Sequence, residues 1–96
     1  MKVGEHLLVC LSEECAEIIQ IVDKALRFGL DDSHPKEPGS NYERIKREIN
    51  DLHGVIELLS EQGIHFPMDR QLIDEKKEKV KKYMEYAKTR RTLETG

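Results

Sequence analysis

The sequence predicts an all-α protein with three helices, and three observations support this fold class. Apolar residues recur at the three-to-four spacing of a helix in three separate segments. The stretches between these segments contain glycine and proline, which interrupt regular structure. The chain also has no Trp, only two Phe and only three Tyr, so it has few of the large side chains that would fill a β-sandwich core.

The first helix is expected over residues 3–28. Its apolar residues lie at helical spacing, and Gly29 follows as a suitable C-terminal stop because glycine tolerates the left-handed conformation common there. These apolar residues are Leu7, Leu8, Leu11, Ile18, Ile19, Val22, Ala25 and Leu26. Residues 30–40 are expected to form a loop, because the prolines and the glycine in this segment prevent regular structure.

The second helix is expected over residues 41–61, and the third over residues 70–90. Ser40 and Glu43 have the spacing of a capping box at the start of the second helix. Asp69 is a suitable cap for the third helix, whose apolar stripe is the thinnest of the three. The second stripe contains Tyr42, Ile45, Ile49, Leu52, Val55, Ile56 and Leu59, and the third contains Leu72, Ile73, Val80, Tyr83, Met84 and Ala87.

A chain of 96 residues is expected to form a single domain over residues 1–96. Such a short chain buries a modest fraction of its surface, so its own core is marginal. Two long antiparallel helices cannot bury their apolar stripes by themselves. We therefore expect homo-oligomerisation to complete the helical bundle, either as a homodimer with a four-helix core or as a dimer of dimers.

Charge, cysteine content and hydropathy predict a cytoplasmic protein that binds neither nucleic acid nor membrane. The net charge of −3 gives no general attraction to nucleic acid, although Lys and Arg predominate locally in residues 69–91. Cys10 and Cys15 lie on different faces of the first helix, so we expect two free thiols in a reducing compartment. No apolar run is long enough to cross a bilayer, and the N-terminus lacks the order of a signal peptide.

Two pairs of acidic residues lie within the apolar stripes of the first two helices. Glu14 and Glu17 are neighbours on the first helix, because residues three apart share one face. Glu48 and Asp51 repeat this arrangement on the second helix. If the two stripes pack together, four carboxylates converge and raise one another's pKa, unless a cation such as Mg²⁺, which prefers oxygen ligands, lies among them. The alternative is that all four are ordinary solvated acids on helix surfaces.

These pairs belong to motifs that resemble those of a known family. Residues 13–17, Glu-Glu-Cys-Ala-Glu, match Glu-Glu-x-x-Glu, and residues 48–51, Glu-Ile-Asn-Asp, match Glu-x-x-Asp. Together they resemble the signature of the MazG-type, all-α nucleoside triphosphate pyrophosphohydrolases, a superfamily that includes the dimeric dUTPases and phosphoribosyl-ATP pyrophosphohydrolase. The resemblance is greatest to small, single-domain members, some of them phage-encoded, and it covers residues 5–60 best. Thirty residues separate Glu17 from Glu48, slightly more than in the family, and the proline-containing loop accounts for the excess.

The resemblance implies that the chain is an enzyme. Members of the family hydrolyse a (deoxy)nucleoside triphosphate between the α- and β-phosphates, which yields a monophosphate and pyrophosphate and sanitises or adjusts the nucleotide pool. Mg²⁺ would be the cofactor, with Mn²⁺ as a substitute, and Glu13 would help to orient or deprotonate the attacking water. The metal ligands that the resemblance implies are Glu14, Glu17, Glu48 and Asp51.

A triphosphate also needs positively charged or polar side chains to bind it. The third helix places Lys76, Lys79 and Tyr83 along a line where an apolar stripe would otherwise continue. The alternative for these lysines is a solvated face with Glu–Lys pairs. Asn50 would contact either the substrate or only a neighbouring loop. The other candidates for substrate binding are Lys24 and Arg27, near the end of the first helix.

Two rival functions remain open on the sequence. The chain would be a non-catalytic oligomerisation or adaptor module if its acids are solvated and its basic third helix docks an acidic partner. Alternatively, the chemistry is the same but the substrate is phosphoribosyl-ATP or an alarmone. The loop at residues 30–40 is either a lid near the base or sugar or a simple connector, and the sequence does not indicate the preferred base or sugar.

Overall fold

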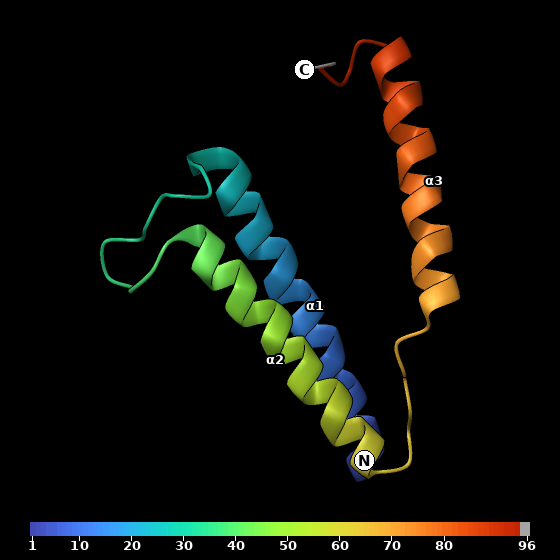
Figure 1. Cartoon of the computed structure of the whole chain (residues 1–96). Coiled ribbons are helices and arrows are strands. Elements are labelled where there is room, and N and C mark those ends of the chain that lie inside the picture. Colours follow the sequence, from blue (N-terminus) through green and yellow to red (C-terminus); the bar gives the residue numbers. More distant parts are fainter. Residues whose placement is uncertain (95–96) are drawn as a thin grey trace. The chain divides into compact units, whose positions relative to one another are not determined.

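The computed structural model describes residues 1–94, which fold into three helices and contain no strand. α1 spans Val3–Phe28, α2 spans Asn41–Glu61 and α3 spans Arg70–Thr89 (Figure 1). The predicted all-α fold with three helices is therefore confirmed, and α3 ends one residue earlier than expected. None of these helices is both long enough and apolar enough to cross a membrane.

The chain divides into two compact units, of which the first spans Met1–Phe66 and the second begins at Pro67. The first unit contains α1 and α2, and the second contains α3. The expected single domain and the expected homo-oligomer both stay predictions. Because the acidic motifs lie at residues 13–17 and 48–51, the candidate metal site belongs entirely to the first unit.

Local side-chain and backbone chemistry sets the ends of the helices. Ser40 Oγ accepts a hydrogen bond from the N–H of Glu43 at 3.2 Å. Asp69 Oδ1 accepts one from the N–H of Leu72 at 3.2 Å. Both capping side chains expected from the sequence are confirmed, and each satisfies a backbone donor that no helical carbonyl reaches. Of the expected capping box, only the bond to Ser40 forms among the described residues, because the Glu43 side chain does not accept from the Ser40 N–H. α1 ends at Phe28 and is followed by its C-cap, Gly29, whose φ of 104° lies in the region that favours glycine.

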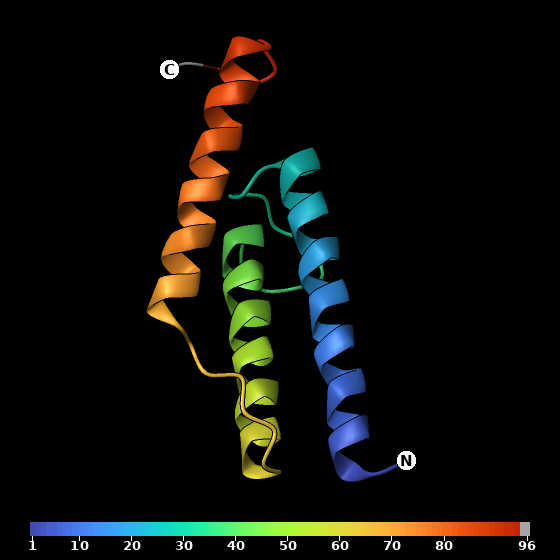
Figure 2. The same cartoon turned by 90° about the vertical axis from the view of Figure 1, so that its right-hand side faces the viewer.

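α1 and α2 form an antiparallel hairpin. Figure 2 shows the two helices side by side, with the loop joining the end of α1 to the start of α2. The buried apolar residues of the described chain are Ile21, Ala25 and Leu59. Other apolar side chains of the same two helices remain exposed, including Ile19 at 62% and Leu26 at 80%. The hairpin therefore leaves apolar side chains of both helices exposed.

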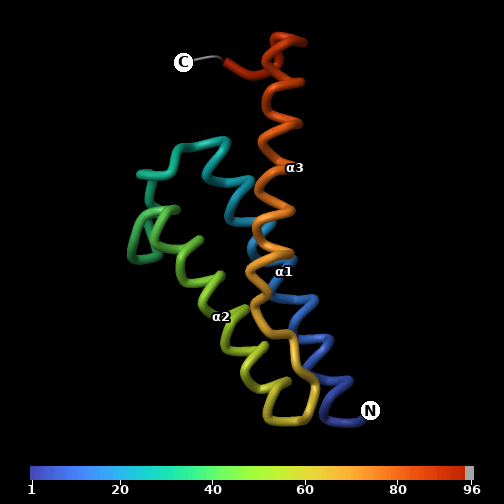
Figure 3. Tube along the Cα trace, turned by 45° about the vertical axis from the view of Figure 1, so that its right-hand side comes forward, coloured from blue at the N-terminus to red at the C-terminus, as the bar shows by residue number. Residues whose placement is uncertain are grey.

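Asn41, the first residue of α2, fastens the loop to α1. Its side chain is buried, and its Nδ2 donates a hydrogen bond to the carbonyl oxygen of Gly29 at 2.9 Å. Its backbone N–H donates to the carbonyl oxygen of Asp32 at 2.8 Å. Figure 3 follows this connection from the end of α1, through the loop, to the start of α2. Asn41 therefore joins the C-terminal end of one helix to the N-terminal end of the next.

Replacing Asn41 by alanine is expected to lower the free energy of unfolding by about 1–3 kcal/mol, because the Gly29 carbonyl loses its donor. Asn50 provides a matched control, since its Nδ2 donates to the carbonyl oxygen of Lys46 on the exposed surface of the same helix. Asn50→Ala is expected to change stability by less than about 0.5 kcal/mol. Urea denaturation followed by circular dichroism measures both variants, and equal losses would contradict the joining role of Asn41.

Candidate metal centre

Three carboxylates from the two helices of the hairpin converge on one point. Glu14 and Glu17 come from successive turns of α1, and Glu48 comes from α2. One oxygen of each carboxylate lies within 4.8 Å of the other two. The helical spacing puts Glu14 and Glu17 on one face, and the antiparallel packing of α2 brings Glu48 to that face. We refer to these three residues as the carboxylate cluster.

Two oxygens of the carboxylate cluster are buried without a partner. Glu14 Oε2 and Glu48 Oε2 are inaccessible to solvent, and neither has a hydrogen-bond partner among the described residues. An unsatisfied buried acceptor costs about 1–3 kcal/mol, and more when it is charged. These two oxygens are therefore the atoms of the cluster that gain most from a bound ligand.

Proximity and burial also raise the pKa values of two members of the cluster. The pKa of Glu48 rises to about 7, first because of burial, then because of the neighbouring carboxyl group of Glu17, and finally because of the charges of Asp51 and Glu14. The pKa of Glu14 is raised by burial and then by the charges of Glu17 and Asp51. The cluster therefore resists carrying its full negative charge at neutral pH without a compensating cation.

Asp51 and Glu13 lie outside the carboxylate cluster. Asp51 is exposed on α2, one turn beyond Glu48, yet its charge is near enough to raise the pKa values of both Glu14 and Glu48. Glu13 is also exposed, and it precedes Glu14 on α1. Of the four metal ligands that the resemblance implies, the structure thus brings three together and places the fourth at their edge.

A small cavity of about 240 Å³, which we call the carboxylate cavity, opens beside the cluster. Its lining residues are Glu17, Gln20, Ile21, Lys24, Arg44 and Glu48. Lys24 was a predicted substrate residue, whereas Arg44 was not. Arg44 lies one turn before Glu48 on α2, so the two residues share one face of the helix. The same helical spacing that relates Glu48 to Asp51 could therefore have identified Arg44 as a residue of the site. The two cations lie where anionic oxygens near the cluster would be bound.

Arg27 and Asn50, which were also predicted to bind substrate, do not line this cavity. The guanidinium of Arg27 lies over the ring of Phe28, with its Cζ 5.1 Å from the ring centroid. The side chain of Asn50 donates to the carbonyl oxygen of Lys46 in its own helix at 2.8 Å. Arg27 therefore has a partner in the neighbouring aromatic ring, and Asn50 has one in its own helix.

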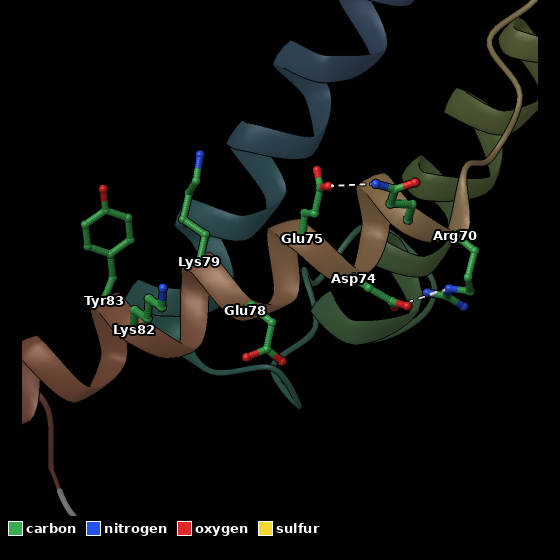
Figure 4. A pocket seen from close by; sticks show the side chains of 8 residues that line it. Arg70, Asp74, Glu75, Glu78, Lys79, Lys82 and Tyr83 are labelled. Atoms are coloured by element: carbon green, nitrogen blue, oxygen red, sulfur yellow. Dashed lines mark hydrogen bonds and ion pairs between the residues drawn. The ribbon is translucent and has the colours of Figure 1, made fainter.

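The remaining predicted substrate residues belong to α3 in the second unit. Lys79 and Tyr83 line an open hollow of about 1010 Å³ along this helix, and Figure 4 shows both side chains projecting to the same side. Lys76 lines a separate hollow with Leu72. An ion pair between Arg70 and Asp74 at 3.3 Å lies in the larger hollow (Figure 4). The role of these α3 residues in substrate binding stays a prediction.

The larger hollow is a weaker candidate for a reaction centre than the carboxylate cavity. All of its lining residues come from one exposed helix. The carboxylate cavity is instead lined by residues of both α1 and α2. They include Glu48, which has one buried oxygen without a partner and a pKa raised to about 7. Groups with perturbed pKa values in a cavity are typical of functional sites.

Comparison of the chain with protein-family models, with curated proteins and with solved structures finds no match. The motif residues and the geometry of the carboxylate cluster are therefore the features of the chain that bear on its function.

Proposed function

We propose that this protein is a Mg²⁺-dependent nucleoside triphosphate pyrophosphohydrolase. In this proposal it hydrolyses a (deoxy)nucleoside triphosphate between the α- and β-phosphates to a monophosphate and pyrophosphate. The observation that carries the proposal is the carboxylate cluster, in which two buried oxygens have no partner. The resemblance of its two motifs to the MazG-type enzymes indicates the reaction, and the adjoining Lys24 and Arg44 provide for a polyphosphate.

The residues of the cluster fit Mg²⁺ better than a softer metal. Mg²⁺ binds oxygen ligands at about 2.0–2.1 Å, so two oxygens on opposite sides of the ion are about 4.2 Å apart. One oxygen of each carboxylate lies within 4.8 Å of the other two. Neighbouring ligands of an octahedral ion are only about 2.9 Å apart, so the side chains would rotate toward one another to hold it. The open cavity beside them leaves room for the waters and phosphate oxygens that Mg²⁺ usually retains. Mn²⁺ is expected to substitute because it accepts the same ligands.

Different residues of the site have different roles in the proposed reaction. Bound Mg²⁺ would neutralise charge on the phosphate oxygens and make the attacking water more acidic. Lys24 and Arg44 bind the non-bridging phosphate oxygens, and the arginine does so through a planar pair of donors. Glu13, next to a ligand of the metal, orients the water and accepts its proton. Asp51, at the edge of the cluster, would be a further residue available to hold the metal.

The proposal includes a homodimer in the cytoplasm. The exposed apolar side chains of α1 and α2, such as Ile19 and Leu26, support a partner that covers the hairpin. The cytoplasm contains the nucleotide pool and keeps Cys10 and Cys15 reduced. Light scattering from the purified chain distinguishes a dimer from a monomer, and a monomer would remove this part of the proposal.

The test of the proposed function is pyrophosphate release from the eight common nucleoside and deoxynucleoside triphosphates. Phosphate is measured with and without added inorganic pyrophosphatase, so that cleavage after the α-phosphate is separated from loss of the γ-phosphate. With Mg²⁺ present, we expect phosphate to appear with at least one nucleotide only when pyrophosphatase is added. Because the pyrophosphatase itself needs Mg²⁺, dependence on the ion is measured by chromatography of the nucleoside monophosphate, whose formation should be abolished by EDTA. The absence of release from every nucleotide, or release of the γ-phosphate alone, would contradict the proposal.

A further inference from the structure

A second cavity adjoins the carboxylate cavity and shares two cationic residues with it. Lys24 and Arg44 line both cavities, and each cavity encloses about 240 Å³. The second cavity is formed by the end of α1, the loop and the start of α2. Its other lining residues are Phe28, Asp32, Ser33, His34, Pro35 and Asn41. Both cavities lie within the first unit, so neither depends on where α3 is placed.

We propose that this second cavity binds the nucleoside half of the substrate, and we call it the nucleoside cavity. This inference rests on the proposed function and specifies how the substrate lies on the protein. The triphosphate would occupy the carboxylate cavity, and the base and sugar would extend past Lys24 and Arg44 toward the loop. The loop at residues 30–40 would then be a wall of the binding site rather than a simple connector.

The two cavities differ in the chemistry of their linings. The carboxylate cavity is bordered by two carboxylates and two cations, with Ile21 as its apolar lining residue. The nucleoside cavity instead presents an aromatic ring and a proline, Phe28 and Pro35. Sites for small molecules commonly enclose about 300–1,000 Å³, which is more than either cavity provides alone. A ligand with a polyanionic half and a flat, less polar half fits the pair of cavities.

Phe28 offers the nucleoside cavity a surface on which a base would stack. Its side chain is 62% exposed, and the guanidinium of Arg27 lies over its ring. Stacking of a base on an aromatic ring is tolerant of base identity because every base has a π-face. Because the guanidinium of Arg27 covers one face of the ring, the base would stack on the opposite face.

His34 adds a hydrogen-bond donor to the wall of the nucleoside cavity. Its Nδ1 accepts a hydrogen bond from the backbone N–H of Lys36 at 3.1 Å. A neutral imidazole that accepts at Nδ1 carries its proton on Nε2. This N–H would donate to a carbonyl oxygen of the base or to an oxygen of the sugar.

Arg44 marks the boundary between the two cavities, and the loop holds it there. Its Nη2 lies 2.7 Å from Oε2 of Glu37, which belongs to the loop. A guanidinium has five N–H donors in a planar fork, so this ion pair leaves donors for a phosphate. Because Lys24 faces both cavities as well, the phosphate nearest the sugar would lie between these two cations.

The test compares two ligands in the presence of Mg²⁺, namely inorganic tripolyphosphate and the four α,β-methylene deoxynucleoside triphosphates, which resist cleavage after the α-phosphate. Isothermal titration calorimetry measures the dissociation constant of each. Phe28→Ala is expected to weaken binding of the best nucleotide by about tenfold or more. The same change should leave tripolyphosphate binding within about twofold, since this ligand has no base to stack. Arg44→Gln is expected to weaken the binding of both ligands.

Two further variants provide the controls. Phe66→Ala removes an aromatic side chain of similar exposure, 51%, that lines neither cavity. This variant is expected to leave the dissociation constants of both ligands unchanged. Phe28→Tyr retains the ring and is expected to keep the nucleotide affinity. The nucleoside cavity is wrongly assigned if the unmodified protein binds both ligands and Phe28→Ala weakens the binding of both equally. It is also wrongly assigned if Phe28→Ala weakens the binding of neither. If the unmodified protein binds neither ligand with Mg²⁺, the proposed function fails and this inference fails with it.

Discussion

Replacing Glu48 by glutamine is expected to reduce pyrophosphate release by more than about 100-fold, because even outer residues of metal sites commonly contribute 10–100-fold. The substitution keeps the shape of the side chain but removes a carboxylate from the centre of the cluster. Glutamine also presents N–H donors, which do not bind a cation. The steady-state rate with saturating Mg²⁺ and nucleotide measures the effect.

Folding provides an independent check on the Glu48→Gln variant. Helical content is expected to be unchanged, and the metal-free variant is expected to melt at or above the temperature of the unmodified protein at pH 8, because repulsion with Glu17, Asp51 and Glu14 is removed. Glu61→Gln is the matched control, since Glu61 is an exposed acid at the end of the same helix. Retained turnover in Glu48→Gln, or an equal loss in Glu61→Gln, would contradict the metal assignment.

Mg²⁺ is expected to stabilise the protein strongly at pH 8 and only weakly at pH 5. At a concentration about 100 times the dissociation constant, a ligand of the native state adds about 2.7 kcal/mol of stability. For a domain of this size, that corresponds to an increase of roughly 10–20 °C in melting temperature. At pH 5 the raised pKa of Glu48 keeps its carboxyl protonated, so the cation must compete with a proton.

The same pKa shift determines how the stability of the metal-free protein changes with pH. The pKa of Glu48 is about 7 in the folded protein and 4.5 ordinarily, so the folded state binds the proton more tightly than the unfolded state does. The stability that this group contributes is fully present below pH 4.5 and is lost as the pH rises through about 7. The unmodified protein should therefore lose stability between pH 5 and pH 8 relative to Glu48→Gln.

Thermal melts with Mg²⁺, Mn²⁺ or EDTA at the two pH values measure both effects. Unchanged melting temperatures with either cation, with and without nucleotide, would favour the rival adaptor function, in which the acids are solvated and the basic α3 docks an acidic partner. If the cation stabilises the protein but the common nucleotides are not hydrolysed, the result would instead favour phosphoribosyl-ATP or an alarmone as the substrate.

The parts of the fold that depend on local chemistry could be predicted from the sequence. Helical spacing is sufficient to give the three helices, and two capping residues, Ser40 and Asp69, give the starts of α2 and α3. The approach of Glu14, Glu17 and Glu48 also follows from spacing, because acids within apolar stripes must meet when the stripes pack.

The parts that depend on tertiary geometry were not accessible in this way. The position of Asp51 at the edge of the cluster depends on the angle at which α2 packs on α1, which periodicity does not specify. The joining role of Asn41 and the ion pair of Arg44 with Glu37 depend on the path of the loop, which has no repeating pattern. The separation of α3 into a second unit could not be predicted either, because its thin apolar stripe does not indicate whether it packs on another helix.

The most direct test of the account is to locate a divalent cation in the protein. Crystals grown with Mn²⁺, with diffraction recorded on both sides of the manganese absorption edge, give the position of the ion without reference to activity. We predict an anomalous peak within bonding distance of carboxylate oxygens of Glu14, Glu17 and Glu48. Manganese bound elsewhere, or these three carboxylates directed separately into solvent with no ion between them, would contradict the account.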